Sequence, residues 1–390
     1  MRILMISDVY FPRINGVSTS IRSFREALQA HGDTVWLVAP AYGPDDERDD
    51  TLLRVPGRPV PFDPEDRLMH RRAVQEALAR LADEPLDVVH VQTPFLAHYA
   101  GCRFARRRGL PVLATYHTLF EEYFHHYVPF LPRVLTRPAA RALTRSQCRA
   151  LDHLIVPSRP MESVLRGYGV RTPMTVLPTG LQLDAFEGGD GARFCAAHRI
   201  PADRPLLVHI GRVAHEKNIP FLLDVLDRLR HRRPDVLLVI AGEGPARSDL
   251  ERRARRMGLM PHLRFVGYLD RRGALLDCYK AGDVFVFASR TETQGLVLLE
   301  AMALGVPVVS TAHLGTRDIL QPGCGALVAE DDVEDFAAKV LRLLDDPDLR
   351  TRLGEAGRRW AQRWSAEAQA ERLHALYESL CRPAPHATAA

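Results

Sequence analysis

The sequence predicts an α/β protein made of two doubly wound domains, each with a parallel sheet covered by helices. Short runs of β-branched residues and leucine recur along the chain, and each is followed by a turn and a segment with helical period. This series occurs twice. With 390 residues, of which 46% are hydrophobic and 26% charged, the chain has the composition of a globular protein of two or three domains.

The first series occupies the amino-terminal half. Several of its runs are apolar throughout, as expected for strands covered on both faces. The first helix is expected to begin near Val17 and to end at His31, because Gly32 supplies a left-handed residue after it. Strands are predicted at Ile3–Ser7, Thr34–Ala39, Val88–Gln92, Val112–His117, Leu154–Pro157 and Thr175–Leu177.

The second series follows a glycine-rich segment, Asp184–Arg204, which is expected to be a linker. Strands are predicted at Leu206–Ile210, Val236–Ala241, Leu263–Val266, Val284–Ala288 and Pro307–Ser310, and helices at Ile219–Arg230, Ser248–Gly258, Leu296–Leu304 and Val333–Leu344. The predicted domains are residues 1–182 and 183–366. A helical tail, Asp348–Leu380, uses Trp360 and Trp364 as packing anchors. Two such halves imply a cleft where the carboxyl ends of both sheets face each other.

Composition excludes several classes of protein. The sequence lacks the stretch of about eighteen apolar residues that a membrane span requires. The apolar start resembles a signal peptide, but Asp8 interrupts it and no small-residue cleavage site follows. The six cysteines form no Cys-x-x-Cys pair, so reduced thiols in a cytoplasmic protein are expected. A net charge of +4 does not indicate nucleic-acid binding.

The most informative segment follows the fourth predicted strand of the second domain. It reads Thr291-Glu-Thr-Gln-Gly-Leu-Val-Leu-Leu-Glu and contains Glu292, Gly295, Leu296 and Glu300. Gly295 allows close approach of a ligand to a helix amino terminus, where backbone N–H groups suit a diphosphate. Glu300 lies in an otherwise apolar helix and needs a partner, for which a sugar diol would serve. The alternative is that Glu292 is a solvated cap and Glu300 belongs to a structural ion pair.

A second segment places two cations after the first strand of the same domain. The strand ends at Gly211-Arg212, Lys217 follows in the loop, and Asn218 is the expected N-cap of the next helix. Arginine grips phosphate oxygens bidentately and lysine adds a compact charge, so both suit a departing nucleotide diphosphate. The alternative for Lys217 is a solvated residue at a helix start. The chain has only three lysines, which makes its position more informative.

These two motifs resemble those of the family 4 glycosyltransferases, which are retaining enzymes of the GT-B fold. That fold consists of two Rossmann-like doubly wound domains facing a central cleft, and its C-terminal helix, here about residues 367–382, crosses back to the N-terminal domain. The resemblance implies that Glu292 contacts the donor sugar, Glu300 binds the ribose, and Arg212 and Lys217 bind the donor diphosphate. It implies a UDP- or GDP-linked sugar as substrate, no cofactor and no metal.

The amino-terminal half contributes two weaker candidates. Gly16 lies in the loop before the first helix, where its amide suits phosphate, although a lone glycine there is more often plain turn chemistry. His117 is the last residue of the fourth predicted strand, and the resemblance implies that it touches the donor sugar; an isolated histidine would be structural. Histidines and glutamates between residues 121 and 126 are spaced as on a helix surface, and we do not interpret them as a metal site.

Twelve arginines against four acidic residues give residues 100–171 a local charge of +8. Five of these arginines are spaced by four on a predicted helix beside apolar residues that include Phe130 and Leu131. This amphipathic surface suits anionic lipid headgroups, and a solvated helix face is the alternative. The five are Arg133, Arg137, Arg141, Arg145 and Arg149.

The amino-terminal half also resembles the bacterial branch that glycosylates diacylglycerol or related lipids. The similar segments are Gly16–Ile21, His90–Pro94, Thr115–Thr118 and Tyr168–Val170. Gln294 stands where many family members have an aromatic residue, and the lipid branch often has glutamine. The expected activity is hexose transfer to a membrane lipid, with the enzyme peripheral on the inner face of the membrane and without an obligate protein partner. A soluble or polysaccharide acceptor, a nucleotide-sugar epimerase or hydrolase, and a sugar-nucleotide sensor are the alternatives.

Overall fold

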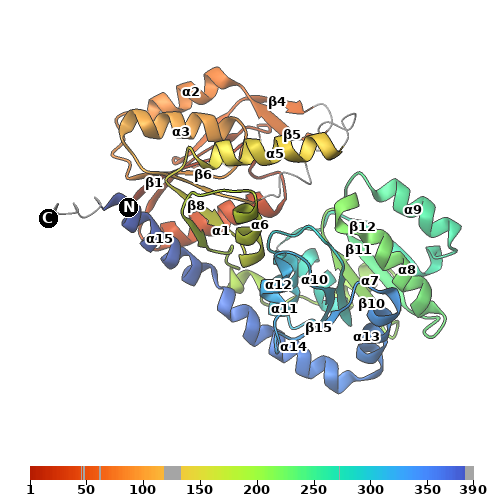
Figure 1. The fold of residues 1–390 in the computed structure, drawn as a ribbon. Helices are drawn as coiled ribbons and strands as arrows, with labels where there is room; N and C mark the ends of the chain where they lie inside the picture. The colour runs from red at the N-terminus through yellow and green to blue at the C-terminus, as the bar shows by residue number, and fades with distance from the viewer. Residues whose placement is uncertain (45, 47–48, 61–62, 118–132, 272, 383–390) are drawn as a thin grey trace. The chain divides into compact units, whose positions relative to one another are not determined.

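The computed structural model describes the chain except residues 45, 47–48, 61–62, 118–132, 272 and 383–390, and the side chains of 63–65 and 133–137 are also not described. The chain divides into two compact units (Figure 1). The first unit comprises Met1–Gly180 and Ala366–Ala390, and the second comprises Leu181–Ser365. The boundary predicted from sequence lay at residues 182 and 183.

A seven-stranded parallel sheet forms the centre of the first unit, in the order β3-β2-β1-β6-β7-β8-β9. Four consecutive residues of β1 are buried, and β6 and β7 are buried throughout, as expected for strands covered on both faces. The strands are β1 (Arg2–Ile6), β2 (Thr34–Pro40), β3 (Leu52–Val55), β6 (Val88–Val91), β7 (Val112–Thr115), β8 (His153–Val156) and β9 (Met174–Val176), beside an antiparallel pair of β4 (Gly57–Val60) and β5 (Asp63–Met69).

Helices cover both faces of this sheet (Figure 1). The Asn15 side chain caps α1 by accepting a hydrogen bond from the Ser18 amide at 2.8 Å, and α1 ends before Gly32, which has φ +96°. This end matches the predicted one. The helices are α1 (Gly16–Ala30), α2 (Arg71–Arg80), α3 (Leu96–Arg108), α5 (Arg133–Cys148), α6 (Arg159–Gly167) and α15 (Ala366–Cys381).

The second unit contains a six-stranded parallel sheet in the order β12-β11-β10-β13-β14-β15. Its strands are β10 (Leu206–Ile210), β11 (Leu237–Ala241), β12 (Leu263–Gly267), β13 (Val284–Phe287), β14 (Val308–Thr311) and β15 (Ala326–Ala329). Its helices are α7 (Gly191–Ala197), α8 (Ile219–Arg230), α9 (Arg247–Arg256), α10 (Ala274–Ala281), α11 (Leu296–Ala303), α12 (Thr316–Ile319), α13 (Val333–Asp345) and α14 (Pro347–Ala361).

Alternate residues of the central strands supply two separate hydrophobic cores. Leu206, Val208 and Ile210 of β10 pack into one cluster, whereas Leu207 packs into the other. This division arises because successive side chains of a strand point to opposite faces of the sheet, and helices cover both faces. Trp360 and Trp364 pack against the first of these clusters, as predicted.

Three predictions about the elements were incomplete or wrong. Residues 184–204 are not a linker, because they contain α7, whose Phe194 is buried and whose Arg193 pairs with Asp277 of α10 at 2.6 Å. The helical tail consists of two helices, α14 in the second unit and α15 in the first, and α15 corresponds to the helix expected at about residues 367–382. No bounds were predicted for strands β3, β4, β5 and β15 or for helices α2, α3, α6, α10 and α12.

Helix α15 packs beside α1 and completes the core of the first unit (Figure 1). Leu373 and Tyr377 are fully buried there, and the Tyr377 hydroxyl lies 2.6 Å from His90 Nδ1. All six cysteines are free. None of the helices in the described part of the chain has the length and apolar character that crossing a bilayer requires.

Candidate active site

The loop after β10 is held by direct backbone contact with the loop after β11. Gly211 has φ +154°, and its amide donates to the Ala241 carbonyl at 3.0 Å. A Cβ at Gly242 would lie 2.0 Å from the Gly211 carbonyl oxygen, so only glycine fits there. Gly242 was missed in the sequence, although it directly follows a predicted strand. This contact fixes the start of the segment that presents Arg212, which is partly buried.

Lys217 and Glu292 form a close ion pair at the carboxyl edge of the second sheet. Lys217 Nζ lies 2.5 Å from Glu292 Oε1, and the side chains are 18% and 16% exposed. Burial by itself would raise the pKa of Glu292, but the Lys217 charge and hydrogen bond outweigh it, so the pKa lies below its ordinary value. The two side chains that sequence reasoning assigned separately are therefore partners.

Two further contacts hold the Lys217 and Glu292 loops in place. Asn218 occupies the N-cap position of α8 without making the predicted cap, and its side-chain amide instead donates to the Ala288 carbonyl at 3.2 Å. The Gly315 amide donates to the Glu292 carbonyl at 2.8 Å, and a Cβ at Gly315 would lie 1.9 Å from the Thr293 carbonyl oxygen. Gly315 gave no signal in the sequence, because its contact depends on the path of a distant loop.

Gly295 and Leu296 begin helix α11, and Glu300 lies one turn further along it. Gly295 has φ +101° at the N-cap position. Glu300 is 2% exposed, and both of its carboxylate oxygens have protein partners. Arg271 Nη2 lies 2.9 Å from Oε1, and the buried Tyr279 hydroxyl donates to Oε2 at 2.7 Å. The ion pair that the sequence left as an alternative for Glu300 is present.

In the first unit, polar side chains follow three neighbouring strands of the sheet. Asp8, Gln92 and His117 come after β1, β6 and β7, at the carboxyl edge. His117 Nε2 lies 2.9 Å from Gln92 Oε1, and burial lowers the pKa of His117 to about 4. His117 is therefore neutral at pH 7 and donates to Gln92.

Asp8 is a site candidate that the sequence analysis did not identify. Burial raises its pKa to about 6, although Thr93 Oγ1 and the Ala97 amide donate hydrogen bonds to its carboxylate at 2.7 and 3.1 Å. The feature of the sequence that could have identified Asp8 was its position directly after a predicted buried strand. Gly16 is the first residue of α1, and a Cβ there would meet no atom within 4 Å, so its backbone is open to a ligand.

The row of arginines runs along α5. The helix continues through Pro138, and Arg149 lies just beyond its end. Arg141, Arg145 and Arg149 are exposed, and the Arg141 guanidinium stacks 4.9 Å from the centre of the Tyr168 ring. Arg133 and Arg137 belong to the helix, but their side chains lie outside the described residues, as do residues 121–126, Phe130 and Leu131.

The described groups suit a substrate that carries both phosphate and hydroxyl groups. In the second unit, the Lys217–Glu292 pair lies beside the glycine turn at residue 295, and Arg212 adds a cation after β10. Glu292 and Glu300 can accept hydrogen bonds from hydroxyl groups. In the first unit, Gly16 offers backbone amides at a helix amino terminus.

Two family descriptions match the chain, one in each half. Residues 14–185 match Glycosyltransferase Family 4, and residues 193–360 match Glycosyl transferases group 1.

Similar curated proteins span nearly the whole chain. An α-monoglucosyldiacylglycerol synthase of Streptococcus pneumoniae is 31% identical over 387 residues, which are 97% of this chain and 85% of the relative. The protein of the same name from Acholeplasma laidlawii is 24% identical, over 97% of each chain. A GDP-mannose-dependent α-mannosyltransferase of Mycobacterium tuberculosis is 28% identical, over 92% of this chain and 93% of that protein.

Solved structures with the same fold include two that cover almost all of the chain. The sucrose-phosphate synthase of Thermosynechococcus elongatus superposes with a TM-score of 0.80 at 24% identity, over 97% of this chain and 98% of that one. Anabaena HepE, in complex with UDP-glucose, has a TM-score of 0.78 at 17% identity, over 97% of this chain and 100% of that one.

Proposed function

This chain belongs to glycosyltransferase family 4, and on that premise we propose that it transfers a hexose from a nucleotide diphosphate sugar to a membrane lipid such as diacylglycerol or a glycolipid. It is a hexosyltransferase of the GT-B fold. The observation that supports the lipid acceptor most is the 31% identity, over 97% of the chain, to a monoglucosyldiacylglycerol synthase.

The second unit is proposed to bind the donor. Arg212 and Lys217 neutralise the diphosphate, and the amides at Gly295 and Leu296 donate to its oxygens. Glu292 contacts the sugar and, through its ion pair at 2.5 Å, keeps the Lys217 ammonium in position. The UDP-glucose complex of the related HepE fold and the GDP-mannose-dependent relatives support a UDP- or GDP-linked donor.

Glu300 is proposed to bind the ribose while it keeps its protein partners. A carboxylate has about four lone-pair positions, and the contacts with Arg271 and Tyr279 use two of them. The remaining positions can accept from two ribose hydroxyls. Tyr279 and Arg271 would then orient the carboxylate rather than compete for it.

Retained configuration is proposed to arise by a front-face reaction. The bond from the anomeric carbon to the diphosphate oxygen breaks, a bond to the acceptor oxygen forms on the same face, and the acceptor proton moves to a departing phosphate oxygen. Leaving-group stabilisation by Arg212 and Lys217 and positioning of the donor supply most of the rate enhancement. His117, neutral and oriented by Gln92, is proposed to hold a donor-sugar hydroxyl, while Gly16 approaches the phosphate. No metal or cofactor is assigned to this step.

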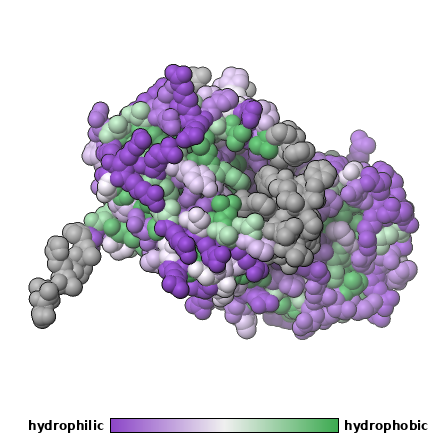
Figure 2. Space-filling view, turned by 45° about the horizontal axis from the view of Figure 1, so that its top comes forward, coloured by the Kyte–Doolittle hydropathy of each residue, from purple (hydrophilic) through white to green (hydrophobic). Residues whose placement is uncertain are grey.

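The α5 surface is proposed to hold the enzyme on anionic lipid, peripheral on the inner face of the cell membrane. Exposed aromatic residues accompany its arginines: Phe95 and Tyr99 are 43% and 52% exposed, and Gln147 of α5 bonds to the Tyr99 hydroxyl at 3.3 Å. Aromatic rings beside cations are typical of membrane interfaces. The face drawn in Figure 2 has hydrophobic side chains interspersed among hydrophilic ones.

Vesicle flotation tests the membrane part of the proposal. Replacing Arg141, Arg145 and Arg149 with Gln should remove about 3 kcal/mol of attraction at low salt, since each cation near an anionic surface contributes about 1 kcal/mol. Wild-type binding should require acidic phospholipid and weaken with added salt. A matched control replaces three exposed arginines of α2, Arg71, Arg72 and Arg80, with the same change in charge. Equal flotation of the α5 and α2 variants would contradict a role for α5.

Product analysis tests the acceptor. Nucleotide sugars are incubated with vesicles containing diacylglycerol, and lipid products are detected by mass. A glycosylated lipid supports the proposal. Transfer only to soluble sugars, or release of free sugar at a rate independent of any acceptor, would contradict it and favour a soluble-acceptor enzyme or a hydrolase.

A further inference from the structure

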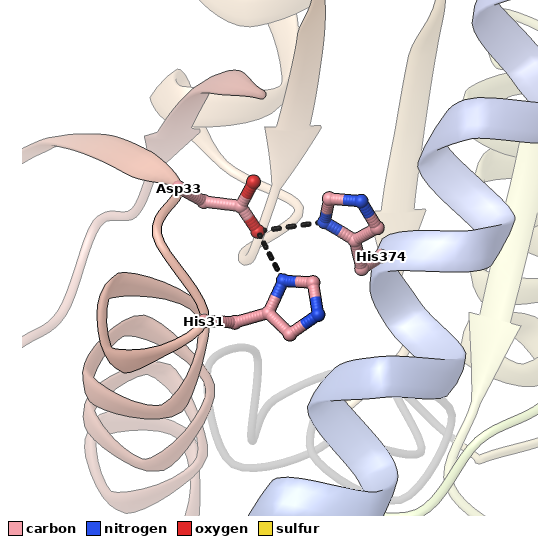
Figure 3. Close-up of side chains that lie close together, drawn as sticks. All are labelled: His31, Asp33 and His374. Atoms are coloured by element: carbon pink, nitrogen blue, oxygen red, sulfur yellow. Dashed lines mark hydrogen bonds and ion pairs between the residues drawn. The ribbon is translucent and has the colours of Figure 1, made fainter.

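Two histidines that are far apart in the sequence converge on one buried carboxylate in the first unit. His31 ends α1, Asp33 lies in the turn before β2, and His374 lies on α15 (Figure 3). Asp33 Oδ2 is 2.8 Å from His374 Nδ1 and 3.8 Å from His31 Nδ1. The Asp33 side chain is 1% exposed, whereas that of His31 is 45% exposed. The cluster is therefore anchored at its base and open on one side.

The spacing of the three donor atoms is close to that of a zinc site. One ligand atom from each residue can be chosen so that all three lie within 4.8 Å of one another. Bonds of about 2.1 Å at tetrahedral angles separate ligand atoms by about 3.4 Å. The distances of 2.8 and 3.8 Å from Asp33 Oδ2 lie on either side of this value. The exposed His31 ring can make the remaining adjustment by rotation of its side chain.

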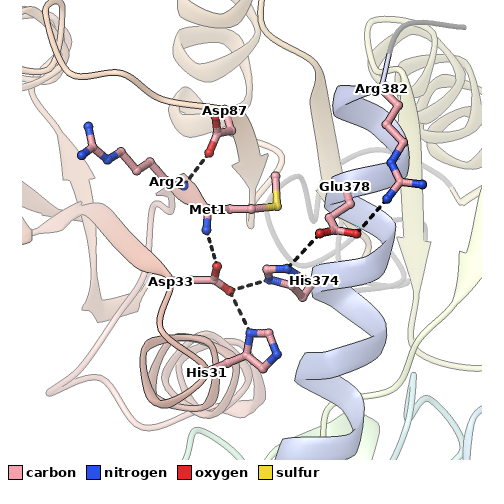
Figure 4. A network of polar contacts seen from close by, with 8 residues as sticks. All are labelled: Met1, Arg2, His31, Asp33, Asp87, His374, Glu378 and Arg382. Atoms are coloured by element: carbon pink, nitrogen blue, oxygen red, sulfur yellow. Dashed lines mark hydrogen bonds and ion pairs between the residues drawn. The ribbon is translucent and has the colours of Figure 1, made fainter.

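Two neighbouring charged groups contact the cluster and leave one oxygen and one ring face of it available (Figure 4). Met1 donates its terminal ammonium group to Asp33 Oδ1 at 2.6 Å, which leaves Oδ2 for the histidines. Glu378, one turn after His374, lies 3.5 Å from His374 Nε2. The His374 ring therefore lies between two carboxylates, and the one at Nε2 can still orient the ring when Nδ1 exchanges its hydrogen bond with Asp33 for a bond to a metal ion. The same outer carboxylate orients histidine ligands in many zinc proteins.

A simple ion pair explains the cluster less well. Met1 already balances the Asp33 carboxylate, so a charged histidine is not needed for neutrality. The two imidazole rings have their centres 4.5 Å apart, and two positive charges at that distance would repel each other. Both Nδ1 atoms approach the same carboxylate oxygen, yet only the His374 contact at 2.8 Å is a hydrogen bond, and the His31 contact is 3.8 Å. A divalent cation satisfies all three groups at once.

We propose that His31, Asp33 and His374 form a structural site for a divalent transition-metal ion, Zn²⁺ first, that fastens α15 to the first unit. Two imidazole nitrogens and one carboxylate oxygen suit zinc better than magnesium or calcium, which prefer oxygen ligands. The cluster lies at the amino end of β2, whereas Asp8, Gln92 and His117 follow the carboxyl ends of their strands. The site is therefore separate from the proposed catalytic groups.

Zinc titration of the tag-free full chain with Met1 intact tests the proposal. Competition with a chromophoric chelator should show one tight equivalent in the wild type. His31→Ala removes an exposed ligand with little risk to folding, and it should weaken that equivalent at least tenfold. His374→Gln should do the same. Bound Co²⁺ should give the visible absorption of a tetrahedral site in the wild type, and this absorption should be lost in both variants.

A matched control is His231→Ala, because His231 is exposed at the end of α8 in the second unit. It should bind zinc as the wild type does. Zinc should also raise the thermal midpoint of the wild type and of His231→Ala, but not that of His31→Ala. Absence of a tight equivalent in the wild type, or equal zinc affinity of the wild type and His31→Ala, would overturn the proposal.

Discussion

Replacing Lys217 by methionine separates its role in catalysis from its role in the ion pair. Methionine keeps most of the aliphatic length and removes the ammonium group. If Lys217 stabilises the departing diphosphate, kcat/KM should fall at least tenfold, which corresponds to about 1.4 kcal/mol of barrier. Steady-state kinetics on the folded variant, with donor concentration varied, measure this change.

The same substitution should also reduce stability, for a reason that is visible in the structure. Lys217 and Glu292 are 18% and 16% exposed, so the variant leaves a largely buried carboxylate without its partner. Breaking such a pair costs about 3 kcal/mol of unfolding free energy. Adding Glu292→Gln should restore about 2 kcal/mol of this, because the buried charge is removed, but it should not restore kcat/KM.

The pH dependence of stability provides an independent check. In the wild type the pKa of Glu292 lies below its ordinary value, so its contribution is present above about pH 4.3 and is lost as the pH falls through the folded-state pKa. Without Lys217, burial is the largest remaining effect, and we expect it to raise the pKa of Glu292 above the unfolded value against the smaller opposing effects of Ser289 and His209. The unfolding free energy of the variant should then decrease as the pH rises from 4 to 7. The difference in unfolding free energy between the wild type and the variant should therefore be smallest near pH 4.

Lys339→Met is the matched control for Lys217→Met, because Lys339 forms an ion pair with Asp335 one turn away on α13. Its loss should cost less than about 1 kcal/mol and leave kcat/KM unchanged. Wild-type kinetics for Lys217→Met would refute the assignment of Lys217 to the leaving group. Recovery of kcat/KM in the double variant would show that Lys217 acts only through Glu292.

Two further predictions concern Glu300 and His90. Glu300→Gln should weaken the binding of UDP or GDP at least tenfold, as measured by calorimetry. It should also cost about 2 kcal/mol of unfolding free energy, because it alters the contacts with Arg271 and Tyr279. A lower Tm with unchanged nucleotide affinity would make Glu300 purely structural. Burial and the nearby His117 lower the pKa of His90 to about 3, so the unfolded chain binds an extra proton below about pH 6.5 and stability should fall on acidification. Urea unfolding should show that His90→Asn loses about 2 kcal/mol less than the wild type between pH 7 and pH 5, and an equal loss in both proteins would count against this account.

Local patterns in the sequence were enough to predict the architecture and several elements. Strand β10 and helix α8 were predicted to the residue, because an apolar run and a helical period are properties of neighbouring residues. The end of α1 followed from Gly32 in the same way. The short strand β15 was missed, because Ala326–Ala329 contains two alanines and a single β-branched residue and so has little strand propensity.

Glycine-rich composition misled the interpretation of residues 184–204. A flexible linker and a tightly packed turn both use glycine, and the sequence alone does not distinguish them. In the structure, a Cβ at Gly189 would lie 2.9 Å from the Leu276 carbonyl oxygen, so this glycine is required by close packing. Whether such a glycine belongs to a flexible linker or to a packed turn depends on which atoms contact it in the folded protein.

The sequence by itself determined which residue types stand at the carboxyl ends of the strands, and tertiary structure decided which of them meet. Glu292 and Lys217 were both candidates, yet their pairing across 75 residues follows from the adjacency of β10 and β13. Glu300 needed a partner on energetic grounds, but only the fold shows that the Tyr279 hydroxyl of α10 lies 2.7 Å from its carboxylate. His374 reaches Asp33 across 341 residues because α15 returns to the first unit. Secondary structure follows from interactions between near neighbours, whereas these contacts depend on strand order and on the path of the chain.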